Sequence, residues 1–239
     1  MPDEIPLLGG AVTAVVQVGN TVRRPPGPQA VYVRELLRFF DQRGWAGAPR
    51  YLGVDDQGRE TLTFVTGEVP WRDPMSMRSD ASLVRVAELM REFHDLTAGT
   101  ALAGDAETVC HNDLSPHNTV YRDGRPIAFV DWDIAAPGGR IQDIAHVAWQ
   151  FLGLGPALVD PTDPARWLRL ICDAYGLADR AELIDAVLRW QDRCWRGIEA
   201  EAAAGDRAKR RLLDRGIPAV IRTEHAWVIE HRATLESAL

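Results

Sequence analysis

The sequence predicts an α+β protein in which a short β-rich part precedes a mainly helical part. Short apolar and β-branched runs separated by turn residues occupy much of residues 11–65, whereas longer segments with helical apolar spacing dominate after residue 80. Two further β runs flank Asp123-Gly124 and interrupt the helical part. A chain of 239 residues is long enough for one large domain or two packed lobes.

The β-rich part is expected to form a small sheet with one helix. Residues 11–18 and the segment TVRR lie on either side of Gly19-Asn20, which is a hairpin-turn signal. Residues 29–43 then show the apolar spacing of a helix that ends at Gly44. A second hairpin is expected around residues 55–58, where a polar turn separates two apolar runs.

The remainder is expected to be mostly helical, with helices over residues 80–96, 163–175, 179–203 and 206–235. Between the first two lies the hairpin around Asp123-Gly124. If these two residues form the loop, Arg122 pairs with Arg125. Counting outward then places Asn118 opposite Phe129 and Pro116 opposite Asp131. Asn118 and Asp131 should therefore be neighbours at the open end of the hairpin.

Composition and charge favour a globular protein of the cytoplasm. The net charge of −7 argues against a nucleic-acid partner and is compatible with a cationic ligand. No apolar run is long enough to cross a bilayer, so no membrane contact is expected, and the first residues lack the features of a secretory signal. The three cysteines are widely spaced, and we expect them to be free thiols.

The polar residues at the open end of the hairpin have the chemistry of a phosphoryl-transfer site. Asn118 and Asp131 offer an amide oxygen and a carboxylate, which are hard ligands of the kind that Mg²⁺ binds together with phosphates. Asp113 lies five residues before Asn118 in the loop that enters the same hairpin, so a further carboxylate is expected to face the bound group.

The segment HNDLSPHN, residues 111–118, resembles the catalytic loop of aminoglycoside phosphotransferases and their choline-kinase relatives, and the segment VDWD, residues 130–133, is similar to their metal-binding segment. This resemblance implies a bilobal protein-kinase-like fold. It implies an N-terminal nucleotide-binding lobe over residues 1–68 and a C-terminal catalytic and substrate-binding helical lobe over residues 69–239.

The resemblance also implies roles for individual residues. Asp113 corresponds to the catalytic base or hydroxyl-orienting carboxylate, and Asn118 and Asp131 correspond to the Mg²⁺ ligands. Asp133 is expected to complete a second metal position or to bind the acceptor. The nucleotide-binding residues would include Gly9 and Gly10 over the phosphates and Phe64, Val65 and Thr66 in the hinge. His111 and His117 are expected to be structural.

One departure from the family concerns its usual strand lysine, which holds phosphates and pairs with a helix glutamate. Here all basic residues except Lys209 are arginines, and the expected strand offers Arg23 and Arg24. Counting across the Gly19-Asn20 turn places Arg23 opposite Val16, on the more apolar face, so Arg23 is preferred and is paired with Glu35.

The expected function is Mg²⁺-dependent transfer of the γ-phosphoryl group of ATP, or of GTP, to a hydroxyl of an aminoglycoside-like or amino-alcohol acceptor. Other acceptors left open by the sequence are choline, a sugar, homoserine and a macrolide. An alternative of a different class is a catalytically weak, kinase-like protein that binds nucleotide and has a regulatory role, because the strand lysine is missing.

Overall fold

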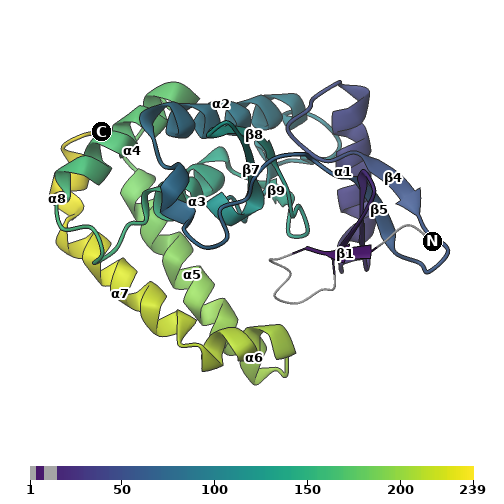
Figure 1. The fold of residues 1–239 in the computed structure, drawn as a ribbon. Helices are drawn as coiled ribbons and strands as arrows, with labels where there is room; N and C mark the ends of the chain where they lie inside the picture. Colours follow the sequence, from purple (N-terminus) through teal and green to yellow (C-terminus); the bar gives the residue numbers. More distant parts are fainter. Residues whose placement is uncertain (1–3, 8–14) are drawn as a thin grey trace. The chain divides into compact units, whose positions relative to one another are not determined.

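A computed structural model describes residues 4–7 and 15–239 of the chain (Figure 1). The predicted phosphate-covering pair Gly9-Gly10 lies outside the described residues. By their contacts the residues form two compact units, one of Met1–Met77 and Glu88–Arg140 and one of Arg78–Ala87 and Ile141–Leu239. This division differs from the expected lobe boundary at residue 68, which stays a prediction.

The first unit contains a five-stranded antiparallel sheet in the order β1-β2-β3-β5-β4. The strands are β1 (Glu4–Pro6), β2 (Val16–Val18), β3 (Thr21–Arg24), β4 (Tyr51–Val54) and β5 (Glu60–Thr63). Both expected hairpins are confirmed, and Val16 pairs with Arg23 as the turn predicted. Strand β1, a short and exposed edge strand, was not predicted from the sequence.

Helix α1 (Ala30–Gln42) is the helix expected in this part of the chain. It buries Val33, Leu36, Leu37 and Phe40, which recur with helical spacing along one face. Figure 1 shows α1 running beside β4 and β5, and the guanidinium of Arg38 lies 4.8 Å from the ring centre of Tyr51 on β4.

The second hairpin consists of β7 (Thr119–Arg122) and β8 (Arg125–Phe129). Arg122 pairs with Arg125 as predicted, but the register shifts between Val120 and Tyr121, so that Thr119 rather than Asn118 lies opposite Phe129. The extra residue follows Pro126 on β8, and a proline has no N–H group for a regular ladder. The predicted pairs at the open end were therefore wrong by one residue.

Two short elements flank this hairpin. The strand β6 (Thr108–Cys110) pairs with β9 (Ala136–Gly138), and a 3-10 turn, η2 (Pro116–Asn118), leads into β7. Neither strand was anticipated, because runs of three residues carry too little periodicity to be recognised.

An aromatic cluster forms the core of the first unit. Phe93 lies at its centre with its ring centre 5.1 Å from that of Trp132, 6.1 Å from that of Phe129 and 6.4 Å from that of Phe40. Trp45 closes the cluster, with its ring centre 4.7 Å from that of Phe40. Because the cluster joins α1, the end of β8 and the segment after it, it holds the polar loops of the unit in place.

The second unit is helical. It contains the first residues of α2 (Asp80–Thr97) and most of α3 (Arg140–Leu152), followed by α4 (Thr162–Tyr175), α5 (Leu183–Ala203), α6 (Arg207–Asp214), α7 (Ile217–Glu230) and α8 (Arg232–Glu236). The helix predicted over residues 206–235 is in fact three helices. Gly216 adopts a left-handed conformation (φ 74°), and Pro218 follows in the first turn of α7.

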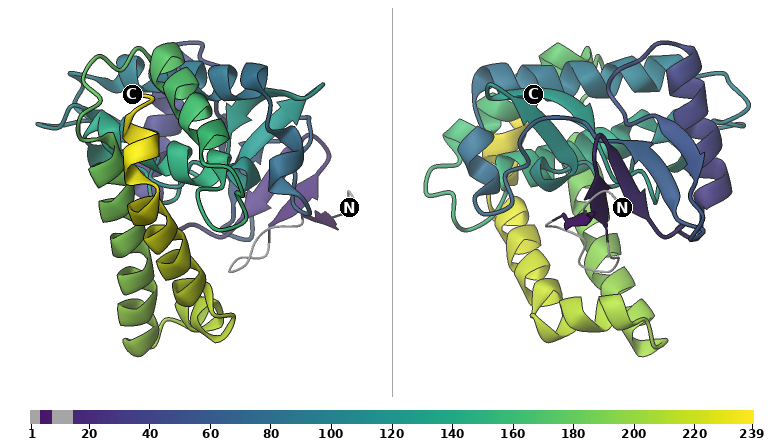
Figure 2. Two further views of the ribbon diagram at one scale, coloured as in Figure 1. Left: turned by 90° about the vertical axis from the view of Figure 1, so that its left-hand side faces the viewer. Right: turned by 45° about the vertical axis from the view of Figure 1, so that its right-hand side comes forward.

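Helices α5 and α7 lie side by side and run in opposite directions, joined through α6 at one end (Figure 2). They bury Trp195, Ile198, Ile221 and Trp227, so these tryptophans belong to the core, as most were expected to. The three cysteines of the chain are free thiols, as predicted. Over the residues described, no helix has the length and apolar character needed to cross a membrane.

Candidate active site

The catalytic loop predicted from residues 111–118 is anchored by its first two residues. His111 is fully buried, and its Nε2 lies 3.1 Å from the carbonyl oxygen of Val130. Asn112 has a left-handed backbone (φ 66°), and its Nδ2 donates to the carbonyl oxygen of Ile134 at 2.9 Å. Since asparagine tolerates this conformation better than most residues, the loop turns sharply here and presents Asp113. The structural role predicted for His111 matches this geometry.

Asp113 and Asn118 are joined directly. The Nδ2 of Asn118 donates to the carbonyl oxygen of Asp113 at 2.9 Å and to its Oδ2 at 2.8 Å. With its nitrogen held in this way, the amide of Asn118 turns Oδ1 away from Asp113, and this oxygen is the atom suited to a metal ion.

The segment of residues 130–133 places two carboxylates on either side of a buried anchor. Trp132 is 1% exposed, and its Nε1 donates to the carbonyl oxygen of Phe129 at 3.0 Å. The side chains of Asp131 and Asp133 are 54% and 36% exposed. Asp131 has a left-handed backbone (φ 64°), which costs roughly 1–2 kcal/mol outside glycine. Strain of this kind is typical of functional positions.

Asp131 follows directly on the hairpin contact that reaches Asn118, because the N–H of Val130 donates to the carbonyl oxygen of Asn118 at 2.9 Å. The pKa of Asp131 is raised, chiefly because the surrounding protein displaces water from its carboxyl group and also because Asp133 carries like charge. Arg24 opposes this shift. About half of the Asp131 side chain is still exposed to solvent, so the protein displaces water from only one side of its carboxyl group.

Arg24, rather than Arg23, reaches these carboxylates. Its Nη2 lies 2.5 Å from Asp133 Oδ1, its Nη1 lies 3.7 Å from Asp131 Oδ1, and its Nε lies 3.2 Å from Glu60 Oε2. The preference for Arg23 is therefore corrected. Arg23 points to the opposite face of β3, where its guanidinium hydrogen-bonds to Thr61 on the neighbouring strand.

Glu60 takes the place that the sequence analysis gave to Glu35. Glu60 is 1% exposed, pairs with Arg24 across β3 and β5, and accepts a second contact of 2.8 Å from Nε of Arg34 on α1. Glu35 is exposed on α1 and, within the described part of the chain, forms no ion pair with Arg23. A β-strand glutamate thus links the helix to the strand arginine.

The residues present fit a divalent metal ion. Asn118, Asp131 and Asp133 supply oxygen atoms, the donors that Mg²⁺ prefers. The positively charged guanidinium of Arg24 lies against the carboxylates of Asp131 and Asp133, which shows that these two groups stabilise positive charge. Asn118 Oδ1 and the strained backbone of Asp131 are further features that suit a ligand set.

The predicted hinge is fixed through its backbone. The N–H of Phe64 donates to the carbonyl oxygen of Asn20 at 2.9 Å, and the carbonyl oxygen of Thr66 accepts from Arg122 at 3.0 Å. Glu68 and Tyr121 exchange two backbone hydrogen bonds of 2.7 and 2.8 Å. Val65 is partly exposed between these fixed points.

Sequence reasoning missed Glu60, Arg34 and the pair formed by Trp71 and His117. The ring of Trp71 stacks on that of His117 with centres 5.5 Å apart, which gives His117 a packing role beside Asn118. Glu60 had a detectable signal, because it is a lone acidic residue at the start of a predicted strand. Nothing in the local sequence marked Trp71.

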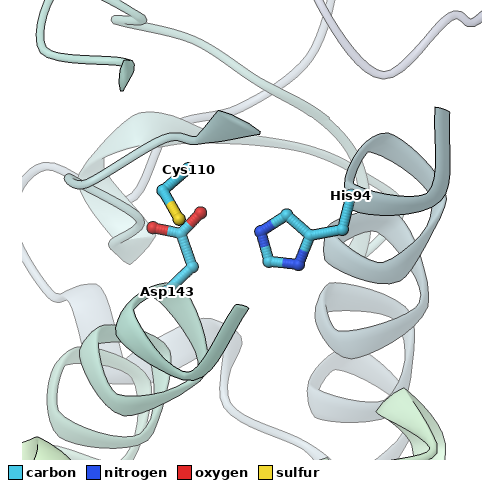
Figure 3. Close-up of side chains that lie close together, drawn as sticks. All are labelled: His94, Cys110 and Asp143. Atoms are coloured by element: carbon cyan, nitrogen blue, oxygen red, sulfur yellow. The ribbon is translucent and has the colours of Figure 1, made fainter. Parts of the chain in front are cut away.

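Two side chains of the first unit that lie outside the predicted site are fully buried. Figure 3 shows His94 on α2 and Cys110 on β6, and both lie in the core of the first unit. Asp143, drawn in the same figure, comes from α3 in the second unit and is also fully buried.

Known proteins resemble this chain in sequence and in fold. Residues 98–185 match the model of the phosphotransferase enzyme family. The trifolitoxin immunity protein of Rhizobium leguminosarum bv. trifolii is 31% identical over 271 aligned residues, which cover all of both chains. Among solved structures, a choline/ethanolamine kinase family protein from Mesorhizobium loti has a TM-score of 0.68 at 14% identity and covers 100% of this chain and 92% of that one.

Two aminoglycoside phosphotransferases have the same fold. The gentamicin complex of APH(2'')-IIa gives a TM-score of 0.62 at 14% identity and covers 94% of this chain and 93% of that one. The GDP complex of aminoglycoside 2'-phosphotransferase-IIIa gives a TM-score of 0.62 at 15% identity and covers 95% of this chain and 93% of that one. The chain thus has the protein-kinase-like fold that the sequence resemblance implied. The chain belongs to the phosphotransferase enzyme family, and to the same family as the trifolitoxin immunity protein.

Proposed function

We propose that this protein transfers the γ-phosphoryl group of ATP or GTP to a hydroxyl of a small molecule in the cytoplasm, with Mg²⁺ as cofactor. One observation carries the proposal. The contacts between Asn118 and Asp113, together with the backbone hydrogen bond from Val130 to Asn118, bring the carboxylate of Asp113 and a set of metal-type oxygens close together.

Each site residue has a defined task in this proposal. The carboxylate of Asp113 accepts the hydrogen bond of the acceptor hydroxyl and orients the lone pair of that hydroxyl toward phosphorus. As the new oxygen–phosphorus bond forms, the bond to the β-phosphate oxygen breaks, the hydroxyl proton passes to Asp113, and the nucleoside diphosphate leaves. Asn118 and Asp131 hold Mg²⁺, which supplies positive charge to the transferring phosphates when bound. Asp133 completes a second metal position or binds the acceptor.

The nucleotide would lie along the first sheet and the hinge. We assign the phosphate-binding role of the missing lysine to Arg24, because its guanidinium is the one that reaches the carboxylates. Phe64, Val65 and Thr66 remain the proposed contacts of the nucleobase, and Gly9 and Gly10 remain the proposed cover of the phosphates. Related structures contain ATP or GDP, so either purine is a reasonable donor to test.

The acceptor is proposed to be an aminoglycoside-like or amino-alcohol compound, and the net charge of −7 supports a cationic one. Solved structures of the same fold contain gentamicin, streptomycin or kanamycin. The relative with 31% identity is named an immunity protein against trifolitoxin. Trifolitoxin is therefore a further acceptor to test, in addition to aminoglycosides, choline, sugars, homoserine and macrolides.

The test is a product-mass screen with ATP and GTP over these acceptors. Asp113→Asn should lower the rate about 10²-fold or more, because it removes the group that takes the proton. Asp123→Asn is the matched control. Asp123 lies in the turn of the same hairpin with a left-handed backbone (φ 52°) that asparagine also adopts, so this variant should keep the wild-type rate. Phosphorylation that survives the loss of Asp113 would overturn the mechanism.

A second candidate function is nucleotide binding with little catalysis. The observation that favours it is the position of Arg24, whose guanidinium already neutralises the carboxylates that would hold the metal ion. Tight nucleotide binding without any phosphorylated product across the whole screen would support this candidate against the first.

A further inference from the structure

The guanidinium of Arg24 is surrounded by three carboxylates. Its three nitrogen atoms face one carboxylate each, at 3.2 Å from Glu60, 3.7 Å from Asp131 and 2.5 Å from Asp133. The side chain of Arg24 is only 10% exposed. An ordinary surface arginine is free to move between partners, whereas this one is confined by its contacts and by burial.

The backbone on both sides holds Arg24 in this position. On one side, Arg24 is the last residue of β3 and pairs directly with Glu60 on β5. On the other, the chain continues as Pro25-Pro26-Gly27-Pro28, in which each proline fixes its φ angle. A Cβ atom on Gly27 would lie 3.4 Å from Oδ2 of Asp133, so this loop lies directly against the carboxylate that Arg24 binds.

The three contacts differ in strength and exposure. Glu60 is buried and also binds Arg34, so we expect the contact between Nε of Arg24 and Glu60 to persist when the other two contacts break. Asp131 and Asp133 are 54% and 36% exposed, and their contacts with the two Nη atoms lie on the open side. The guanidinium can therefore release the two aspartates while it stays attached to Glu60. A lysine, with one nitrogen, has no such second edge.

We propose that Arg24 is an internal cation that closes the metal site until nucleotide binds. In the nucleotide-free protein its guanidinium neutralises Asp131 and Asp133 and competes with a free divalent cation. The phosphates of an incoming nucleotide attract the Nη edge of Arg24, which frees both aspartates for the metal ion. Metal ion and nucleotide consequently raise each other's affinity by the same factor. This inference rests on the proposed metal-binding role of Asn118 and Asp131.

The test measures binding of Mn²⁺ alone, by the loss of the free-ion signal in electron paramagnetic resonance, without nucleotide. Arg24→Gln should bind Mn²⁺ at least about tenfold more tightly than the wild type, because a unit charge beside a divalent ion is removed. Arg24→Lys keeps the charge but reaches fewer carboxylates, so its gain in Mn²⁺ affinity should be smaller. This variant replaces Arg24→Gln in the test if Arg24→Gln folds poorly.

Arg34→Gln is the matched control. Arg34 also binds Glu60, yet among the described residues it forms no ion pair with either aspartate. This variant therefore loosens the same network and leaves the metal site closed. Its Mn²⁺ affinity should equal that of the wild type. A gain in Arg34→Gln as large as that in Arg24→Gln would overturn the proposal in favour of general loosening.

Two other results separate this inference from the proposed function. Equal Mn²⁺ affinity of wild type and Arg24→Gln, with binding lost in Asp131→Asn, would overturn the role of Arg24 and leave the metal site intact. If no variant binds Mn²⁺, even with saturating ATP analogue present, the metal assignment in the proposed function is wrong, and the role of Arg24 fails with it.

Discussion

Gly67 marks a place where two backbones approach too closely for any side chain. A Cβ atom at this position would lie 2.4 Å from the carbonyl oxygen of Tyr121 and 2.5 Å from Cγ1 of Val120. The carbonyl oxygen of Tyr121 belongs to the pair of hydrogen bonds that joins β7 to Glu68. Gly67→Ala therefore has to push the hinge away from β7, because the atom in its way is main chain.

The expected loss of stability follows from two contributions. Relieving such an overlap in a packed region costs about 1–3 kcal/mol. Weakening the two Glu68–Tyr121 hydrogen bonds adds up to about 1 kcal/mol each. We expect Gly67→Ala to lower the free energy of unfolding by about 1–5 kcal/mol.

Urea unfolding followed by tryptophan fluorescence measures this change. Gly197→Ala is the matched control, because Gly197 lies inside α5 and a Cβ there meets no described atom within 4 Å. This control should gain about 0.5–1 kcal/mol from the helix preference of alanine. Unfolding of Gly67→Ala at the same urea concentration as the wild type, or at a higher one, would contradict the predicted overlap with β7.

Three further changes test the packing and the charges of the two units. Glu60→Gln removes the buried carboxylate that the guanidiniums of Arg24 and Arg34 share, and it should cost about 2 kcal/mol or more in urea unfolding. Phe93→Ala empties the centre of the aromatic cluster and should cost about 3–5 kcal/mol in the same assay. Burial raises the pKa of Glu224 despite its 2.9 Å hydrogen bond from Trp149, so the folded state holds its proton more tightly than the unfolded state. The free energy of unfolding should therefore fall as pH rises from the ordinary glutamate pKa through the raised one, and Glu224→Gln should remove this slope.

Each of these changes has a control or an opposing result. Asp80→Asn breaks an exposed ion pair and should leave the free energy of unfolding unchanged. If Glu60→Gln has no larger effect than Asp80→Asn, the buried Glu60 carboxylate does not stabilise the fold. Val159→Ala, at a side chain that is 97% exposed, is the control for Phe93→Ala. Identical pH profiles of wild type and Glu224→Gln would show that this carboxyl group has its ordinary pKa in the folded protein.

The sequence predicted what short turns determine. The Gly19-Asn20 turn fixed the pairing of Val16 with Arg23 because the two strands follow each other directly. The Asp123-Gly124 turn fixed Arg122 against Arg125 in the same way, but the shift beyond Pro126 moved every pair further out by one residue. Local rules therefore held up to the first irregularity.

The sequence did not predict which arginine faces the carboxylates, for a physical reason. That choice depends on the pairing of β3 with β5, and 35 residues separate Arg24 from Glu60 in the chain. No turn fixes a register across such a distance, so the apolar face was judged from the first hairpin alone. The segment of residues 111–118, in contrast, is a contiguous motif, and Asn118 contacts Asp113 within it.

The balance of charge at the site connects its parts. The carboxylates of Glu60, Asp113, Asp131 and Asp133 outnumber the guanidiniums of Arg24 and Arg34 by two, which equals the charge of one divalent cation. The raised pKa of Asp131 is consistent with this excess of negative charge. If phosphates draw Arg24 toward them, Arg24 no longer neutralises the negative charge of Asp131 and Asp133 when the metal ion arrives. A single arginine in place of the lysine would thus couple the two ligands through charge alone, without any movement of the backbone.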